Sequence, residues 1–216
     1  MNAPFPDRRS SPIVFLVARD LDAWDPWPPI VVARRLAGIG VPWCIAGGWA
    51  LDLFLGRQTR EHADLEIAVP ANRFADVARR FPDCEFHVPG GGQVVPLSDE
   101  AMREHHQTWA RERATSTWRF DVFREPHDRD TWICRRNARI RRPYAEIIEC
   151  DGDGIPFLAP EVVLLFKAKA ARDKDNLDLQ AVLPQLDAGR RNWLADALDV
   201  VHPGHPWRAL VSPRSP

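Results

Sequence analysis

The chain has 216 residues, of which 45% are hydrophobic, and a formal net charge of -1. This length supports one large domain, or one domain with a helical extension, around a sizeable core. A net charge this close to zero gives no global attraction to nucleic acid or to anionic membranes, so we expect neither as a partner.

The cysteines and the N-terminal sequence indicate a cytoplasmic protein. The four cysteines are far apart and form no CxxC pair, which favours reduced thiols over a disulfide framework; they are Cys44, Cys84, Cys134 and Cys150. The N-terminal charges are not followed by the apolar h-region of a signal peptide, and no later segment approaches the length that spans a bilayer.

Hydrophobic periodicity and turn residues predict an alternation of helices and strands, followed by helices alone. Residues 1–12 are rich in proline and polar side chains, and we expect them to be frayed. Residues 97–115 are polar and are predicted as a loop or an exposed helix. In chain order the pattern predicts a helix at 30–37, strand 43–46, helix 49–55, strand 64–69, helix 72–80, strands 85–88, 117–123, 131–135 and 145–150, and helices beginning at 160, 175 and 190.

The change of pattern near Pro160 suggests a division of the chain. Proline suits the first position of a helix, and apolar residues with helical spacing follow it. We therefore predict a frayed segment at 1–12, an α/β domain at 13–156, a C-terminal helical unit at 157–201 and a tail at 202–216.

Two carboxylates lie two residues apart in the predicted strand at 64–69. Side chains at alternate positions of a strand share a face, so Asp64 and Glu66 would lie side by side. Two such charges repel unless a cation lies between them, and carboxylate oxygens select Mg²⁺ or Mn²⁺. The alternative is an exposed strand face on which both carboxylates are solvated.

A glycine pair and a third acid favour the metal interpretation. Gly47-Gly48 precedes a predicted helix, where backbone N–H groups and the helix dipole favour a phosphate, although a tight strand-to-helix turn also explains it. Asp121 interrupts an apolar strand, where a buried, unpaired carboxylate would cost several kcal/mol. It is either a further metal ligand and general base, or an edge residue paired with Arg119 or Arg124.

The motif around these residues resembles the signature of aminoglycoside 2″-nucleotidyltransferase-like proteins, a branch of the polymerase-beta-type nucleotidyltransferase superfamily. The matching sequence is Gly47-Gly48-Trp49-Ala50, then Gly56-Arg57-x-Thr59-Arg60-x-His62-x-Asp64-x-Glu66. The resemblance implies an α/β (α+β) fold, in which a mixed β-sheet is flanked by helices and a C-terminal helical unit closes over the substrate.

The same resemblance implies a role for each motif residue. Gly47 and Gly48 would contact the nucleotide phosphates, and Asp64, Glu66 and Asp121 would be catalytic and hold Mg²⁺ or Mn²⁺, with Asp121 as general base on the acceptor hydroxyl. The superfamily more often has aspartate at the position of Glu66, whose longer side chain can shift the metal.

The implied reaction is transfer of AMP from ATP to a hydroxyl of a small acceptor, such as an aminoglycoside. Arg57, Lys167 and Lys174 are the further candidates for binding the nucleoside triphosphate, although the lysines could instead pair with nearby aspartates. Trp49 and Glu125 are the candidates for binding the acceptor.

Other interpretations remain open from the sequence. A cationic acceptor would require acids near Asp121, for which Glu125, Asp128 and Asp130 are candidates. The arginine-rich run at 135–142 would matter if the acceptor were RNA or a protein, and it is otherwise a solvated or nucleotide-facing patch. A non-catalytic, regulatory protein of the same fold is a further alternative. We expect a monomer or a homodimer.

Overall fold

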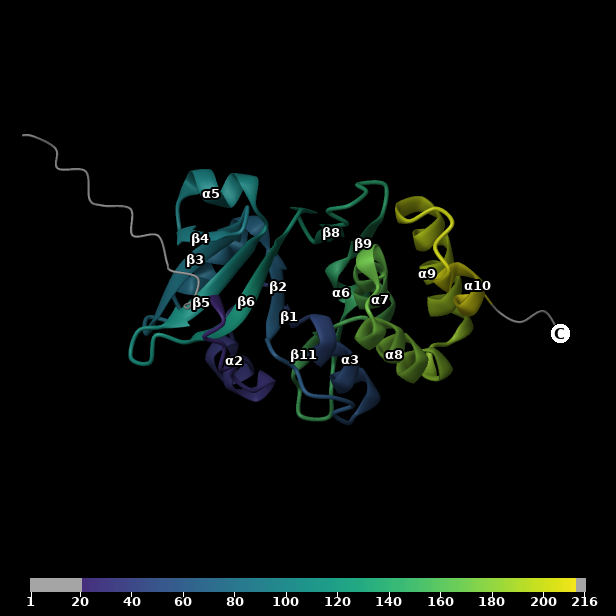
Figure 1. Cartoon of the computed structure of the whole chain (residues 1–216), viewed down its shortest axis with the longest axis horizontal. Coiled ribbons are helices and arrows are strands. Elements are labelled where there is room, and N and C mark those ends of the chain that lie inside the picture. The colour runs from purple at the N-terminus through teal and green to yellow at the C-terminus, as the bar shows by residue number, and fades with distance from the viewer. Residues whose placement is uncertain (1–20, 213–216) are drawn as a thin grey trace, which may run out of the picture.

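A mixed β-sheet of eight strands forms the centre of the molecule (Figure 1). The structure is a computed structural model, and it describes residues 21–212. The strand order is β10-β11-β1-β2-β6-β5-β3-β4, and β7, β8 and β9 form a separate small sheet. The strands are β1 (Cys44–Ile45), β2 (Glu66–Pro70), β3 (Cys84–Gly90), β4 (Gln93–Pro96), β5 (Gln107–Glu112), β6 (Trp118–Glu125), β7 (His127–Asp128), β8 (Thr131–Ile133), β9 (Arg141–Pro143), β10 (Ile148–Cys150) and β11 (Pro156–Leu158).

The helices flank this sheet, and the last of them gather at one end of the molecule (Figure 1). Helix α7 packs against α3, α8 and α9, and α9 packs against α10. The α-helices are α2 (Pro29–Leu36), α3 (Gly47–Leu55), α4 (Phe74–Ala78), α5 (Asp99–Glu104), α6 (Tyr144–Ile147), α7 (Pro160–Lys167), α8 (Asp173–Val182), α9 (Ala188–Val201) and α10 (Trp207–Val211), with 3₁₀ turns at Ala71–Arg73, Ala168–Ala170 and Leu183–Gln185. The predicted mixed sheet with flanking helices and a C-terminal helical unit is confirmed.

Two strand pairings make the sheet mixed and place the motif at its centre. Strand β2 pairs antiparallel with β1 and parallel with β6. Strand β6 is buried along almost its whole length, because its neighbours β2 and β5 cover both edges and side chains pack on both faces. The motif strand β2 is thus held between two other strands of the sheet.

The structure corrects the prediction for residues 97–115. This segment contains the short helix α5 and the strand β5, which pairs with both β3 and β6. Buried and less buried residues alternate along β5. The buried ones, Thr108 and Ala110, are polar or small, so the sequence shows no hydrophobic alternation there. The buried hydroxyl of Thr108 accepts a hydrogen bond of 2.8 Å from Nε of Arg124, which compensates its burial.

Other predictions shift at their boundaries. A short helical turn, α6, precedes β10 within the strand predicted at 145–150. The predicted tail contains α10, whose Trp207 is buried and donates a hydrogen bond of 2.8 Å from Nε1 to Oδ1 of Asn176. Burial of an indole with its N–H satisfied ties this segment to α8. The frayed segment predicted at 1–12 lies outside the described residues.

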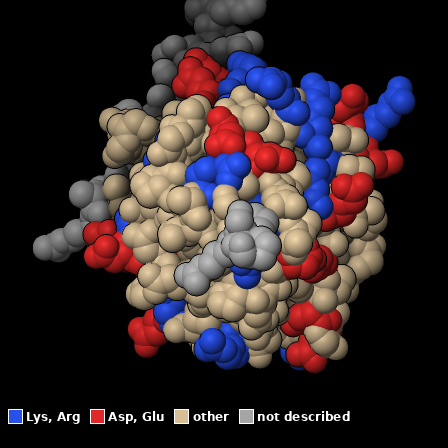
Figure 2. Space-filling model, turned by 90° about the vertical axis from the view of Figure 1, so that its right-hand side faces the viewer, with Lys and Arg blue, Asp and Glu red and all other residues tan. Residues whose placement is uncertain are grey.

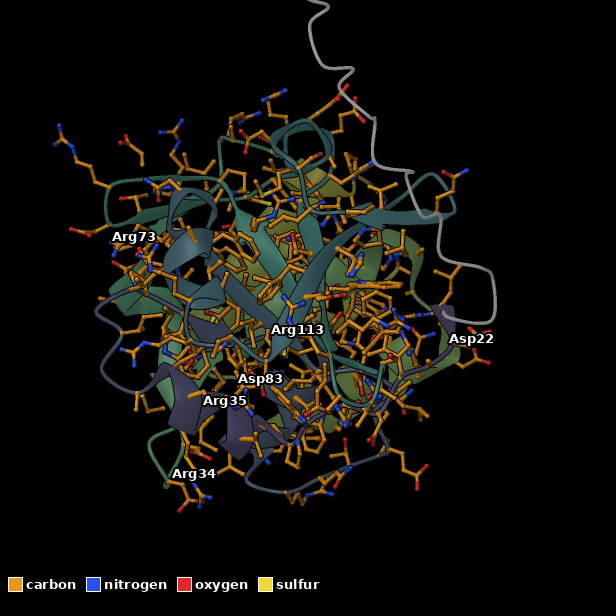
Figure 3. The ribbon with its side chains drawn as sticks, turned by 90° about the vertical axis from the view of Figure 1, so that its left-hand side faces the viewer. Asp22, Arg34, Arg35, Arg73, Asp83 and Arg113 are labelled. Atoms are coloured by element: carbon orange, nitrogen blue, oxygen red, sulfur yellow. The ribbon has the colours of Figure 1, made fainter. Side chains whose placement is uncertain are left out.

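An aromatic cluster packs against strand β6 of the sheet. The ring of Phe120 in β6 lies 4.7 Å from that of Phe81 and 5.9 Å from that of Trp27, measured between centroids. Helix α2 is also fixed from outside, because the Arg35 guanidinium donates to Asp83 at 2.7 Å, and these two residues lie side by side in Figure 3. The sheet and α2 therefore form one packed unit.

The surface carries acidic and basic side chains, and three of the four cysteines are buried beneath it. Acidic and basic side chains lie interspersed on the face viewed in Figure 2. Cys44, Cys84 and Cys134 are buried, Cys150 is exposed, and all four are free thiols. Among residues 21–212, no helix is long and apolar enough to cross a membrane.

Truncation of Phe120 should strongly destabilise the fold. We expect Phe120→Ala to lower the free energy of unfolding by about 3–5 kcal/mol, because it opens a cavity in the aromatic cluster. Urea denaturation followed by circular dichroism measures this change. Leu177→Ala is the control, since this leucine is 61% exposed and its truncation should change stability by less than about 0.5 kcal/mol. Equal losses in the two variants would contradict the assignment of Phe120 to the core.

Candidate active site

The first glycine of the motif makes room for a carboxylate. Gly47 starts α3 with a φ of 58°, a conformation that favours glycine. A Cβ atom built on Gly47 would lie 1.3 Å from Oε2 of Glu66. The backbone N–H of Ala46 also donates to the carbonyl oxygen of Glu66 at 2.7 Å. The turn from β1 to α3 and the Glu66 carboxylate are therefore in direct contact.

The second glycine makes room for the loop that precedes β2. A Cβ atom on Gly48 would lie 2.5 Å from Nδ1 of His62 and 2.5 Å from Nη2 of Arg60. Neither contact would be tolerated, so the absence of a side chain at Gly48 lets this loop pack on the start of α3.

Strand register brings two of the predicted acids together. In the parallel pairing of β2 with β6, Glu66 lies opposite Asp121, and the backbone N–H of Asp121 donates to the carbonyl oxygen of Leu65 at 2.7 Å. Asp64 is exposed and precedes β2, which begins at Glu66, so the strand predicted at 64–69 starts two residues too early. Asp64 thus lies just before β2, with Glu66 and Asp121 more deeply placed.

Asp121 is buried and only half satisfied. Its side chain accepts a hydrogen bond of 2.6 Å at Oδ2 from Nε2 of Gln107 in β5. Its Oδ1 atom is buried and has no hydrogen-bond partner among the described residues. The sequence analysis missed Gln107 because β5 was not predicted; the buried alternation of Thr108 and Ala110 was the available signal.

Burial and mutual repulsion raise the pKa values of both inner acids. Burial, followed by the nearby charge of Asp64, raises the pKa of Glu66 to about 7, although Lys167 and Lys174 oppose the shift. Burial raises the pKa of Asp121 to about 8 against the hydrogen bond from Gln107, and the charges of Glu66 and Asp64 add to the rise. Three carboxylates thus create a region of negative potential that favours a cation.

The carboxylates at this site fit a metal ion that binds together with a substrate. In the part of the chain that the structure describes, no three acidic, histidine or cysteine side chains form a complete metal cluster. Mg²⁺ does not need one, because it is usually bound by one or two carboxylates, substrate phosphates and water. The unpartnered Oδ1 of Asp121 and the adjacent Glu66 supply two such carboxylates.

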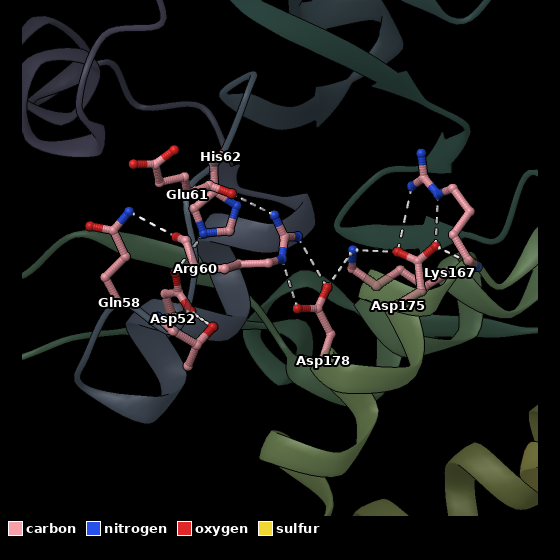
Figure 4. A network of polar contacts seen from close by, with 10 residues as sticks. Asp52, Gln58, Arg60, Glu61, His62, Lys167, Asp175 and Asp178 are labelled. Atoms are coloured by element: carbon pink, nitrogen blue, oxygen red, sulfur yellow. Dashed lines mark hydrogen bonds and ion pairs between the residues drawn. The ribbon is translucent and has the colours of Figure 1, made fainter.

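Asp52 organises the motif loop from inside α3 (Figure 4). Its Oδ1 accepts hydrogen bonds from the backbone N–H and the hydroxyl of Thr59, at 3.1 and 2.6 Å. Its Oδ2 lies 2.5 Å from Nε2 of His62, whose ring stacks on Trp49 at 4.6 Å between centroids. The motif residues Thr59 and His62 therefore hold the loop. Sequence analysis did not single out Asp52, although a carboxylate inside a largely apolar helix was a visible signal.

A chain of ion pairs connects this loop to the C-terminal helices (Figure 4). Arg60 donates from Nε and Nη2 to the two carboxylate oxygens of Asp178, at 3.0 and 3.1 Å. Lys167 lies 2.9 Å from Asp178 and 3.0 Å from Asp175, and Arg172 pairs with Asp175 at 2.9 Å. Lys167 therefore pairs with nearby aspartates, which was the alternative interpretation of the lysines. The network fixes α8 against the loop that leads to Glu66.

A cavity of about 410 Å³ opens beside Glu66. Of the predicted site residues, Gly47, Glu66, Glu125 and Lys167 line it. Apolar side chains form much of the remaining wall, among them Tyr144, Ile147, Leu158, Val163 and Phe166. A cavity of this size and character suits one small organic molecule.

The structure places several other predicted residues away from this cavity. Trp49 and Arg57 line a different cavity, together with Glu149 and Asp151. Lys174 is exposed on α8, from where its charge acts on Glu66 without lining the cavity. These assignments stay predictions.

Glu125 lines the cavity but is already paired. It is 3% exposed, forms an ion pair with Arg135 and accepts a hydrogen bond of 3.2 Å from Nε1 of Trp132. Asp128 and Asp130 are exposed in the hairpin of β7 and β8 and line none of the cavities described here. None of these three acids is therefore both unpaired and in a cavity where it could bind a cationic acceptor.

One family model matches the part of the chain that carries the motif. Residues 30–106 match the family model of aminoglycoside-2''-adenylyltransferase, a segment that contains α3, the motif loop and β2. The part of the chain that carries the motif is thus similar to this family. The match also confirms the resemblance predicted from the Gly-Gly and Asp-x-Glu motif. The matched segment ends before Asp121, and no curated protein matches the sequence.

Solved structures of antibiotic-modifying proteins share the fold. The solution structure of the antibiotic-resistance factor ANT(2'')-Ia aligns with a TM-score of 0.54 at 15% identity, covering 80% of this chain and 90% of that one. The same protein in complex with adenylyl-2''-tobramycin gives 0.51 at 13% identity, with 78% and 93% covered. The lincomycin-bound lincosamide adenylyltransferase LnuA gives 0.50 at 16% identity, with 78% and 98% covered.

A side chain at position 47 should disrupt the site specifically. We expect Gly47→Ala to weaken Mg²⁺-dependent ATP binding at least about tenfold, because its Cβ would displace the Glu66 carboxylate. Gly56→Ala is the matched control, since Gly56 ends the same helix with a φ of 65° and has open space around it. Both variants should lose about 1 kcal/mol of stability from backbone strain. Titration calorimetry measures binding, and equal losses of ATP binding would contradict the contact with Glu66.

The ion-pair network should contribute stability that depends on pH. Burial raises the pKa of Asp175, but hydrogen bonds from Arg172 and Lys167 outweigh it and bring the pKa to about 2. An unfolded aspartate titrates near 3.9, so the contribution of Asp175 is present above about pH 4 and is lost as the pH falls toward 2. We expect Asp175→Asn to be destabilised by about 1–2 kcal/mol at pH 7 and by clearly less near pH 2.5.

Urea midpoints at both pH values measure this difference. Asp173→Asn is the control, because Asp173 is exposed in the first turn of the same helix. A deficit of Asp175→Asn that stays constant with pH would contradict the inferred role of its charge.

Proposed function

We propose that the chain transfers a nucleoside monophosphate, AMP from ATP, to a hydroxyl group of a small acceptor. The observation that carries the proposal is the register of β2 and β6, which sets Glu66 opposite Asp121 beside the Gly47 turn. Carboxylates, a glycine turn at a helix start and a cavity are the parts that binding a metal-associated triphosphate requires.

Glu66 and Asp121, with Asp64 at the exposed end of β2, are the residues that would hold Mg²⁺ or Mn²⁺. When bound there, the ion would neutralise charge on the phosphate oxygens and on the leaving pyrophosphate. The raised pKa values of Glu66 and Asp121 support this assignment, because burial and, to a smaller extent, neighbouring negative charge disfavour the ionised carboxylates, and an added positive charge would offset both effects.

In the proposed reaction the acceptor oxygen attacks the α-phosphorus of ATP. A bond forms between that oxygen and phosphorus, and the bond from the α-phosphorus to the bridging oxygen of pyrophosphate breaks. The hydroxyl proton passes to the ionised carboxylate of Asp121. The raised pKa of Asp121, about 8, makes the ionised form a stronger base than an ordinary aspartate, and the carboxyl must first release its own proton to solvent, which a cation bound beside it would favour. Gln107 holds Oδ2 of Asp121, and Oδ1 is buried without a hydrogen-bond partner among the described residues.

The positive residues along the first cavity suit the triphosphate. Lys167, Lys169 and Arg172 line it at the junction of α7 and α8. Lys167 is 11% exposed and is held by Asp175 and Asp178, so its ammonium group is fixed in place before any ligand arrives. Preorganised charge of this kind binds phosphate without the cost of ordering a free side chain.

The acceptor is proposed to be an antibiotic or a molecule of similar size. The structures that share the fold were solved with lincomycin and with adenylylated tobramycin. Both are small hydroxylated compounds.

Removal of the Asp121 carboxylate should separate chemistry from nucleotide binding. In a pyrophosphate-release assay with ATP, Mg²⁺ and an acceptor panel, we expect Asp121→Asn to lower kcat at least about a hundredfold, because the general base is lost. The Kd of ATP measured without a divalent cation should change by less than about threefold. Asp128→Asn is the matched control, since Asp128 is exposed outside the cavities. ATP binding without acceptor-dependent pyrophosphate release across the panel would contradict the proposal.

A further inference from the structure

A second cavity, of about 610 Å³, adjoins the first. The two cavities share part of their wall, formed by Phe123, Arg135, Arg136 and Lys169. The second cavity is also lined by Gln107, the residue that donates a hydrogen bond to Asp121. It therefore lies next to the carboxylate proposed to take the acceptor proton.

The charged residues of this second cavity are almost all positive. Its wall contains Arg103, Arg124, Arg135, Arg136 and Lys169, and its only carboxylate is that of Glu104. A cavity lined by one sign of charge concentrates ligands of the opposite sign.

Most of these cations have no anionic partner among the described residues. Arg124 donates to the Thr108 hydroxyl and to the carbonyl oxygens of Met102 and His105. Arg136 donates to the Leu165 carbonyl oxygen at 3.1 Å and lies 3.2 Å from His202.

The remaining residues divide into one paired arginine and two exposed cations. Arg135 is the exception, being paired with Glu125. Arg103 and Lys169 are exposed, and no ion pair is found for either within residues 21–212. The positive charge of the cavity is thus largely uncompensated by the protein.

Nearby positive charge, together with burial, lowers the pKa values of two residues in the wall of the second cavity. Burial, followed by the charges of Arg135, Arg124 and Arg136, lowers the pKa of His106 to about 4. Burial and the neighbouring Arg135 lower the pKa of Arg136 to about 10. Both groups hold a proton less readily than usual, as expected where positive charge accumulates.

We propose that the acceptor of this nucleotidyltransferase carries an anionic group, a phosphate or a carboxylate, that binds in the second cavity beside Asp121. This inference rests on the proposed function and narrows its acceptor class. A polycation such as an aminoglycoside would meet like charge there, and Glu125 is already occupied by Arg135. The acceptor hydroxyl would reach Asp121 while its anionic group contacts Arg103, Arg136 and Lys169.

Binding of inorganic phosphate in the presence of a bound nucleotide tests the proposal directly. The full chain is saturated with Mg²⁺ and a non-hydrolysable ATP analogue, so that the nucleotide site is filled, and phosphate is then titrated by calorimetry at low salt. We expect phosphate to bind, and Arg103→Gln to weaken its Kd roughly three- to tenfold, with a larger loss for Arg103→Glu.

Two further variants control for charge. Glu104→Gln removes the only carboxylate of the wall and should tighten phosphate binding roughly twofold or more. Arg139→Gln removes an exposed arginine that does not line the cavity, and phosphate binding should stay unchanged. Arg103 does not line the first cavity, so the Kd of the ATP analogue should change less than about twofold in its variants.

Three results would overturn the proposal. The analogue could abolish phosphate binding, which would assign the second cavity to the triphosphate of the nucleotide. Phosphate binding could be unaffected by the Arg103 variants. In a turnover panel of matched acceptors, such as glucose with glucose 6-phosphate, tobramycin could be preferred over every anionic member. That last result would leave nucleotidyl transfer intact, whereas absence of ATP binding and turnover would overturn the proposed function itself.

Discussion

The parallel pairing of β2 with β6 is the constraint on which the site depends. It sets Glu66 opposite Asp121 in the interior of the sheet, where burial and nearby carboxylate charge raise the pKa of both carboxyls. Two buried carboxylates close together destabilise a folded protein unless a bound ligand compensates their charge. The Glu66 carboxylate occupies the space that a side chain at position 47 would need. The position of Glu66 in the sheet therefore also requires a glycine at this turn.

The rest of the molecule holds these carboxylates in position. Asp52 anchors the motif loop to α3, and Arg60 connects the same loop through Asp178 to Lys167. Because Asp178 lies on α8 and Lys167 at the end of α7, the C-terminal helices and the sheet are linked by charge as well as by packing. The motif residues that carry no chemistry are thus the ones that assemble the site.

The sequence predicted the fold class and the central residues because local patterns encode them. The apolar strands, the glycine pair and the acids at 64, 66 and 121 are all visible without a structure. The partnerships were not visible, because they depend on strand order. Strand β5 was missed since polar residues such as Gln107 and Thr108 occupy it, and their burial makes sense only beside Asp121 and Arg124. Likewise, nothing local shows that Glu125 is neutralised by Arg135.

The central claim is that Glu66 and Asp121 share one cation, and binding of Mn²⁺ tests it most directly. Electron paramagnetic resonance can measure the Kd of Mn²⁺ with and without an ATP analogue for the wild-type chain, Glu66→Gln and Asp121→Asn. The structure predicts that each single variant weakens Mn²⁺ at least about tenfold and that the double variant loses little more, because both carboxylates hold the same ion. Wild-type affinity in both single variants would contradict the account.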